Sequence, residues 1–145
     1  MTMNVTDTEV GTLRAGFLGG GFMAAVHSRA VRAAQATPAL IASSRPETSA
    51  SAARALGITA SAIDPAALIA SDIDVVHVCT PNATHAAYAA AALATGKHVI
   101  CEKPLATSVD EARALVTTAR ESGLVAAVPF VYRYHPQVRE MRARI

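Results

Sequence analysis

The sequence has few charged residues, few aromatic residues and only two cysteines. Charged residues make up 17% of the chain and aromatic residues 4%, with no tryptophan, whereas hydrophobic residues reach 52%. The formal net charge is +2 and the basic residues are scattered, which gives no indication of a nucleic-acid-binding surface. No apolar stretch is long enough to cross a bilayer. These features are typical of a globular α/β chain, and 145 residues suffice for one domain with a buried core.

The two cysteines, Cys79 and Cys101, lie near the ends of predicted strands. Neither has a further Cys or His at ligand spacing, so no metal site is predicted. We expect buried, reduced thiols, which are typical of a cytoplasmic protein. Residues 1–12 contain acidic side chains and no apolar core, and are expected to be a polar tail rather than a signal peptide.

Apolar runs and helical patterns alternate along the rest of the chain. Strands are expected over residues 13–19 and 39–43, from residue 58, and over residues 74–79, 97–101 and 124–130. Helices are expected after the glycines of residues 19–21 and over residues 46–56, 64–69, 82–95, 108–122 and 137–145. This alternation predicts a doubly wound, mostly parallel Rossmann sheet with helices on both faces. Residues 13–136 are expected to form this domain.

A glycine motif separates the first strand from the first helix. Residues 19–24 fit the pattern G-x-G-x-x-A. Gly19 suits a tight turn, Gly21 allows the backbone to approach a pyrophosphate, and Ala24 allows close helix packing. With Phe22 and Met23, these glycines are expected to contact a dinucleotide at the helix N-terminus. The alternative is a plain loop.

The end of the second strand bears on the choice of cofactor. NAD-binding sites usually place an acidic residue here, whereas an arginine accommodates the 2′-phosphate of NADP. This sequence has Ser43, Ser44 and Arg45, and its first acidic residue is Glu47. It therefore favours NADP, with NAD possible. The alternative is that Arg45 is a solvated loop charge.

Polar residues follow the fourth predicted strand at the edge where the glycine motif also lies. His77, inside the strand, is expected to be a hydrogen-bonded structural histidine. For Asn82, helix capping and contact with cofactor ribose or phosphate both remain open, and contact is equally open for His85. The candidate cofactor contacts in this turn are Thr80, Pro81, Asn82 and His85.

The fifth predicted strand ends in two charges and a proline, Glu102, Lys103 and Pro104. Proline cannot continue a strand ladder because it has no N–H. In open α/β sheets, ligands bind in the crevice beyond the carboxyl ends of the strands. Lys103 is therefore a candidate ligand-contacting residue, and the alternative is a surface lysine in a turn.

Four motifs together resemble the N-terminal half of the glucose-fructose oxidoreductase and inositol dehydrogenase family, Gfo/Idh/MocA. They are GFLGGGFMA at residues 16–24 with His27 following, CTPNATH at 79–85, GKHVICEKPLA at 96–106 and FVYRYHP at 130–136. The resemblance implies a Rossmann domain that binds NADP or NAD. It also implies a second α/β domain that helps to form the substrate site and a homo-oligomer. The implied activity is hydride transfer between the nicotinamide and a sugar, inositol or related polyol or carbonyl substrate, with no nucleic-acid or membrane partner.

The resemblance also assigns roles to individual residues. Lys103 matches the catalytic lysine near the nicotinamide and substrate, Glu102 is placed near the nicotinamide ribose, and the Lys103–Pro104 bond is expected to be cis. The second domain and its histidine partner for Lys103 are absent from this sequence. We therefore expect residues 137–145 to begin a helix leading to a missing domain, and the chain to be an inactive fragment of a longer enzyme.

Two other functions are considered from the residues. One is a non-catalytic dinucleotide-binding module, such as a redox sensor or a scaffold, although such a module needs no ionisable pair at the nicotinamide end. The other is an S-adenosylmethionine methyltransferase. It is disfavoured because the second strand does not end in the acidic residue that its ribose requires, and because Glu102 and Lys103 have no role there.

Overall fold

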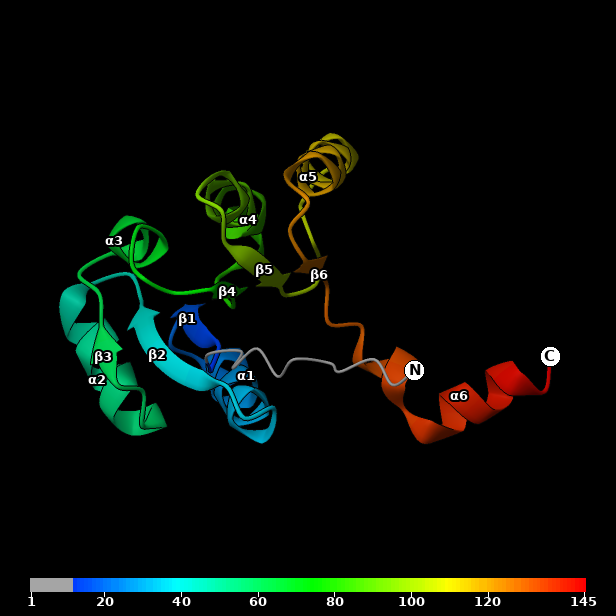
Figure 1. The fold of residues 1–145 in the computed structure, drawn as a ribbon, viewed down its shortest axis with the longest axis horizontal. Coiled ribbons are helices and arrows are strands. Elements are labelled where there is room, and N and C mark those ends of the chain that lie inside the picture. Colours follow the sequence, from blue (N-terminus) through cyan, green and yellow to red (C-terminus); the bar gives the residue numbers. More distant parts are fainter. Residues whose placement is uncertain (1–11) are drawn as a thin grey trace, which may run out of the picture.

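The computed structural model describes residues 12–145, so nearly all of the expected polar tail lies outside the described residues. Strands and helices alternate through these residues (Figure 1). The strands are β1 Arg14–Leu18, β2 Thr37–Ala42, β3 Ala60–Ser61, β4 Val75–Val78, β5 His98–Cys101 and β6 Ala126–Ala127. The helices are α1 Phe22–Ala33, α2 Pro46–Leu56, α3 Pro65–Ile69, α4 His85–Ala94, α5 Val109–Ser122 and α6 Pro136–Ala143. Short 3-10 helices span Asn82–Thr84 and Val131–Tyr134.

The described strands form one parallel sheet in the order β3-β2-β1-β4-β5-β6. Helices α1 and α2 cover one face, and α3, α4 and α5 cover the other (Figure 1). The core is divided accordingly. One cluster joins Phe17 and Ile41 to the first pair of helices, and the other joins Val76 and Val99 to α3, α4 and α5. This arrangement confirms the predicted doubly wound Rossmann sheet.

Local sequence signals explain where several helices begin and end. At α3, the Asp64 carboxylate accepts a hydrogen bond from the Ala67 N–H at 2.7 Å. Ser108 and Glu111 form the predicted capping box of α5, in which each side chain accepts a backbone N–H of the other residue. Gly57 ends α2 with a left-handed φ of 62°, a conformation that glycine adopts at little cost.

The predicted sixth strand is much shorter than its apolar run. Residues 124–130 were expected to be a strand, but only Ala126 and Ala127 pair with β5. Pro129 has no N–H to donate, and a 3-10 helix begins two residues later. The expected third strand likewise lies at residues 60–61 rather than starting at Ile58. Both strands lie at edges of the sheet, where few neighbours reinforce the pairing.

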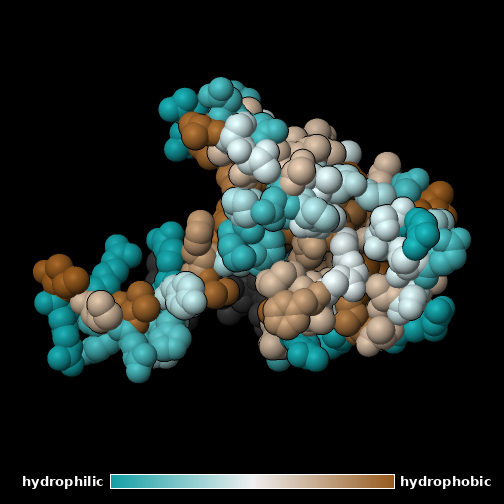
Figure 2. Space-filling model, turned by 180° about the vertical axis from the view of Figure 1, so that it is seen from behind, coloured by the Kyte–Doolittle hydropathy of each residue, from teal (hydrophilic) through white to brown (hydrophobic). Residues whose placement is uncertain are grey.

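The C-terminal arm, residues 130–145, lies apart from the sheet (Figures 1 and 2). It contains the second 3-10 helix and α6, and it exposes several large apolar or aromatic side chains. Examples are Tyr132, which is 77% exposed, and Met141, which is 64% exposed. Within the part of the chain that the structure describes, no helix is long and apolar enough to span a membrane.

Candidate functional site

The glycine turn connects the ends of three neighbouring strands. Gly19 follows β1 with a φ of +95°, and its N–H donates to the carbonyl of Ala42 at the end of β2, at 2.7 Å. A Cβ at Gly19 would lie 2.6 Å from the carbonyl oxygen of Cys79, just after β4. A side chain is therefore excluded by both conformation and space, which confirms the tight turn predicted at this glycine.

Gly21 is different, because its surroundings are open. It is the N-cap of α1 with a φ of −89°, and a Cβ built there would meet nothing within 4 Å. Helix α1 has no side-chain cap, and no acidic residue lies in its first turn. Such a helix N-terminus presents N–H groups and a partial positive charge to an anion. Behind it, the fully buried Ala24 packs α1 against the sheet.

A cleft of about 650 Å³ opens beside the glycine turn, at the carboxyl ends of β1, β2 and β4. The predicted cofactor contacts that line it are Gly19, Gly21, Phe22, Met23, Ser43, Ser44, Thr80 and Pro81. Gly20, Ala42, Pro65, Cys79, Thr84 and Tyr88 also line it. The predicted site residues outside its lining are Arg45, Asn82, His85, Glu102 and Lys103. The structure therefore brings together the glycine, serine and threonine-proline turns, as expected for one ligand at this edge.

The serine loop after β2 is held by a residue that sequence reasoning missed. The buried Ser49 hydroxyl accepts the Ser43 N–H at 2.8 Å and donates to the Arg45 carbonyl at 3.0 Å. Thr48 also binds the Arg45 backbone, donating to its carbonyl at 2.8 Å. The side chain of Arg45 is exposed at the start of α2. Its backbone is thus fixed beside the cleft. The position of Ser49, four residues after Arg45, was the available signal.

His85 connects the turn after β4 to the loop after β5. Its Nδ1 lies 2.7 Å from the carbonyl oxygen of Pro104, and its Nε2 lies 2.8 Å from that of Thr80. The ring is fully buried, so it offers no surface to a cofactor. This corrects the prediction of His85 as a cofactor contact, because each ring nitrogen already lies within hydrogen-bonding distance of a protein carbonyl oxygen. The Lys103–Pro104 peptide bond in the same loop is cis, as expected.

Glu102 is buried and bound on both sides. It is 5% exposed, and its Oε1 lies 3.0 Å from Nε2 of His27, which comes from α1. Its Oε2 accepts the backbone N–H of Lys103 at 3.1 Å and lies 4.0 Å from Lys103 Nζ. The Lys103 side chain itself is 63% exposed. Glu102 therefore faces the protein interior, while Lys103 extends from the same loop into solvent.

His27 in turn contacts His77 in β4, with 2.9 Å between their Nδ1 atoms. His77 also stacks on Phe17, with ring centroids 5.0 Å apart. Burial, and secondarily the neighbouring His27, lowers the pKa of His77 from 6.5 to about 3. His77 is therefore a neutral, hydrogen-bonded histidine, as predicted. The role of His27 was missed, although it was noted as part of the glycine motif.

The two cysteines are free thiols. Burial, with the charge of Glu102 as a smaller cause, raises the pKa of Cys79 and of Cys101 to about 12. Both therefore remain protonated near neutral pH and are poor nucleophiles. In the described part of the chain, no cluster of His, Cys, Asp or Glu could hold a metal ion.

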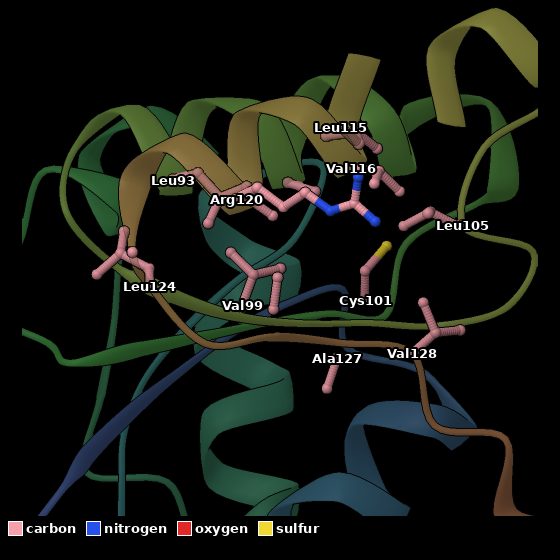
Figure 3. Close-up of a pocket in the computed structure, with 14 residues that line it drawn as sticks. Leu93, Val99, Cys101, Leu105, Leu115, Val116, Arg120, Leu124, Ala127 and Val128 are labelled. Carbon is pink, nitrogen blue, oxygen red and sulfur yellow. The ribbon is translucent and has the colours of Figure 1, made fainter. Parts of the chain in front are cut away.

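A second groove, of about 530 Å³, lies between helices α4 and α5 and the strands β5 and β6 (Figure 3). Leu93, Val99, Leu115 and Val128 are among its apolar lining, and Arg120 is its charged side chain. Among the residues that the structure describes, no helix N-terminus lies in its lining, and the glycine that lines it, Gly123, is at the C-terminal end of α5. The cleft beside Gly19, which is also the larger of the two, is therefore the better candidate for a nucleotide.

Comparison with known proteins agrees with this architecture. The family model described as "Oxidoreductase family, NAD-binding Rossmann fold" (Gfo/Idh/MocA) matches residues 13–130. The chain belongs to this family. Residues 13–130 are thus an NAD(P)-binding Rossmann domain of an oxidoreductase.

Individual relatives in the Gfo/Idh/MocA family are sugar dehydrogenases. Levoglucosan dehydrogenase of Pseudarthrobacter phenanthrenivorans is 42% identical over 136 residues, covering 87% of this chain and 35% of that protein. D-xylose 1-dehydrogenase (NADP(+)) 2 of Haloferax volcanii is 42% identical over 109 residues, covering 74% and 33%. The structure of levoglucosan dehydrogenase with NADH and levoglucosan matches with a TM-score of 0.81 and 39% identity, covering 85% of this chain and 36% of that one. The chain spans about a third of these relatives' length.

Proposed function

We propose that the cleft beside Gly19 and Gly21 holds the dinucleotide, with its pyrophosphate at the N-terminus of α1. The observation that carries this proposal is the open space at Gly21, at a helix start without a side-chain cap or an acidic residue. The adenosine end would extend towards Ser43 and Ser44 after β2, and the nicotinamide end towards Thr80 and Pro81 after β4. A bound nicotinamide supplies or accepts a hydride.

We further propose that Lys103 contacts the reacting oxygen of the substrate. Support comes from the strand pairing, since the Glu102 N–H donates to the Val78 carbonyl at 3.0 Å, next to the cleft-lining Cys79. This pairing brings the loop after β5 beside the nicotinamide end of the cleft. The exposed ammonium group can donate a hydrogen bond to a hydroxyl or carbonyl oxygen, polarise it and exchange a proton with it. Within the described residues 12–145, the lining of the cleft itself contains no lysine, arginine or histidine.

The proposed substrate class is sugars, inositols and related polyols or their carbonyl forms. The names of two relatives, levoglucosan dehydrogenase and D-xylose 1-dehydrogenase, support this class. Because the chain spans about a third of their length, the proposed activity is that of the whole protein that carries this sequence. We also propose that this whole protein is a homo-oligomer, with the exposed apolar side chains of residues 130–145 as the supporting observation.

NADP is the proposed preferred cofactor. The cleft lining contains serines and no carboxylate where the second strand ends, and Arg45 follows these serines directly. An arginine at this place favours a 2′-phosphate, whereas a carboxylate favours the ribose hydroxyls of NAD. The relatives do not decide the matter, because one is named for NADP(+) and another was solved with NADH.

Two measurements test the proposal. Fluorescence titration of the purified chain with NADPH and NADH tests the cleft, and absence of binding at millimolar cofactor would contradict it. An assay of sugar and polyol oxidation in the whole protein tests the chemistry, with Lys103→Ala as the test variant and Lys97→Ala, in the turn before β5, as the matched control. Loss of kcat in Lys103→Ala alone is expected. Equal turnover in both variants would remove Lys103 from the mechanism.

A further inference from the structure

Three ionisable side chains from distant parts of the chain form a continuous buried array. His27 comes from α1, His77 from β4 and Glu102 from the end of β5, and each is at most 7% exposed. The contacts run from His77 Nδ1 to His27 Nδ1 at 2.9 Å, and from His27 Nε2 to Glu102 Oε1 at 3.0 Å. The rings of the two histidines meet edge to face, with centroids 5.2 Å apart. The array ends at the backbone N–H and the ammonium group of Lys103.

The hydrogen placement in this array is strongly restricted. An ionised carboxylate only accepts hydrogen bonds, so Nε2 of His27 must carry the hydrogen that points to Glu102. One hydrogen must also lie between the two Nδ1 atoms. His77 can supply it to a neutral His27, or a protonated His27 can supply it to His77. In both cases His27 donates to Glu102, and His77 determines how the His27 ring is turned.

The two oxygens of the Glu102 carboxylate have different partners. One oxygen is held by His27, and the other is left facing Lys103. A buried carboxylate that loses one of its donors is costly, because the oxygen has no water to replace the lost hydrogen bond. It would then take up a proton or rotate away from its site. Either response changes the charge or the position of the group beside Lys103.

We propose that His27 is a positioning residue for the Glu102–Lys103 loop, and that His77 fixes the orientation of the His27 ring. His27 touches neither substrate nor cofactor in this role. It acts through Glu102, whose second oxygen sets the place of the Lys103 backbone and ammonium group. The importance of these contacts for catalysis rests on the proposed function of Lys103. The contacts themselves can be tested without cofactor or substrate.

The first test observes the hydrogen bond between the two histidines. In protein labelled with ¹⁵N-histidine, an N–H···N bond gives a scalar coupling between its two nitrogens. We expect this coupling between the Nδ1 atoms of His27 and His77 in the wild-type protein and its loss in His27→Gln. A folded wild-type protein without the coupling, or with a His77 ring that is protonated near pH 6, would overturn the proposal.

The second test observes Lys103 directly. The sequence contains two lysines, Lys97 and Lys103, so reductive ¹³C-methylation gives two lysine signals besides that of the N-terminus. Lys97→Arg assigns them. We expect His27→Leu to shift the Lys103 signal towards its position in Glu102→Gln and to leave the Lys97 signal in place. His27→Gln, whose amide can still donate to Glu102, should restore most of the wild-type Lys103 signal.

The outcomes distinguish the positioning role of His27 from the proposed function of Lys103. A folded His27→Leu protein with an unchanged Lys103 signal would refute the positioning role. If His27→Leu does not fold, the comparison of His27→Gln with Glu102→Gln decides, and equal Lys103 signals in these two variants would refute it. NADPH is then added to the wild-type protein. A Lys103 signal that does not respond to NADPH counts against the proposed function, whereas the histidine coupling and the variant shifts remain valid for the positioning role.

Discussion

Substituting Gly21 by alanine should separate cofactor binding from folding. The backbone at Gly21 has a φ of −89°, which alanine adopts freely, and the added Cβ meets nothing within 4 Å. Alanine is a poorer N-cap than glycine by up to about 1 kcal/mol. The loss of backbone freedom in the unfolded chain offsets this by about 0.4–1 kcal/mol. We therefore expect the free energy of unfolding to change by less than about 1 kcal/mol.

The expected effect on binding is larger. If the pyrophosphate approaches the N-terminus of α1, the new methyl group occupies the space that the phosphate oxygens need, and it holds them away from the N–H groups of the first turn. We expect the Kd for NADPH to rise at least tenfold, which corresponds to about 1.4 kcal/mol. NADPH fluorescence titration measures the Kd, and urea unfolding of the same samples measures stability. Wild-type affinity in Gly21→Ala would refute the proposed path of the pyrophosphate.

Gly19→Ala is the matched control, because here the added Cβ is blocked by the protein itself. The φ of Gly19 is +95°, and the Cβ would lie 2.6 Å from the Cys79 carbonyl oxygen. Backbone strain of this kind costs about 1–3 kcal/mol before the clash is counted. We therefore expect Gly19→Ala to lose stability as well as affinity. If Gly21→Ala lost stability and Gly19→Ala did not, the roles assigned here to the two glycines would be wrong.

Three further predictions follow from individual contacts. The pKa of His77 is 6.5 in the unfolded chain and about 3 in the folded protein. The stabilisation of the folded state by neutral His77 is therefore complete above pH 6.5 and is lost as the pH falls. Urea unfolding should show a loss of about 2 kcal/mol between pH 6.5 and 4.5, and a flat profile would contradict a buried neutral His77. Ser108→Ala removes the acceptor of the Glu111 N–H and should destabilise the protein by about 1 kcal/mol in the same assay, with Ser122→Ala at the other end of α5 as the control. Arg45→Ala should raise the Kd for NADPH at least fivefold and leave that for NADH within twofold, and an equal change for both cofactors would show that Arg45 does not contact the 2′-phosphate.

Much of the fold could be predicted because its signals are local. The capping box of Ser108 and Glu111, and the glycine that ends α2, each depend on residues within a few positions of one another. The sixth strand could not be predicted in the same way. Its length depends on pairing with β5 across the sheet edge, and the apolar run of residues 124–130 carries no information about where that pairing ends.

The site shows the same division between local and distant information. The tight turn at Gly19 was predicted from adjacent residues and is confirmed, with a φ of +95° at this glycine. The environment of Glu102 was not predictable in this way, because its partner His27 lies 75 positions earlier in the sequence. A charge at the end of a buried strand indicated a ligand. The structure shows that the Glu102 carboxylate instead binds a buried histidine, and only Lys103 is directed outward.

Two histidines therefore hold the loop around Lys103 from opposite sides. His27 binds the side chain of the residue before Lys103, and His85 lies within hydrogen-bonding distance of the carbonyl of Pro104, the residue after it. The backbone of Lys103 is thus restrained at both neighbours, while its side chain stays exposed. A catalytic group held in place by the protein avoids paying an ordering cost in each reaction cycle. In the proposed role of Lys103, the Rossmann domain would therefore hold the backbone of this residue in place, and only its exposed side chain would have to be ordered by the substrate.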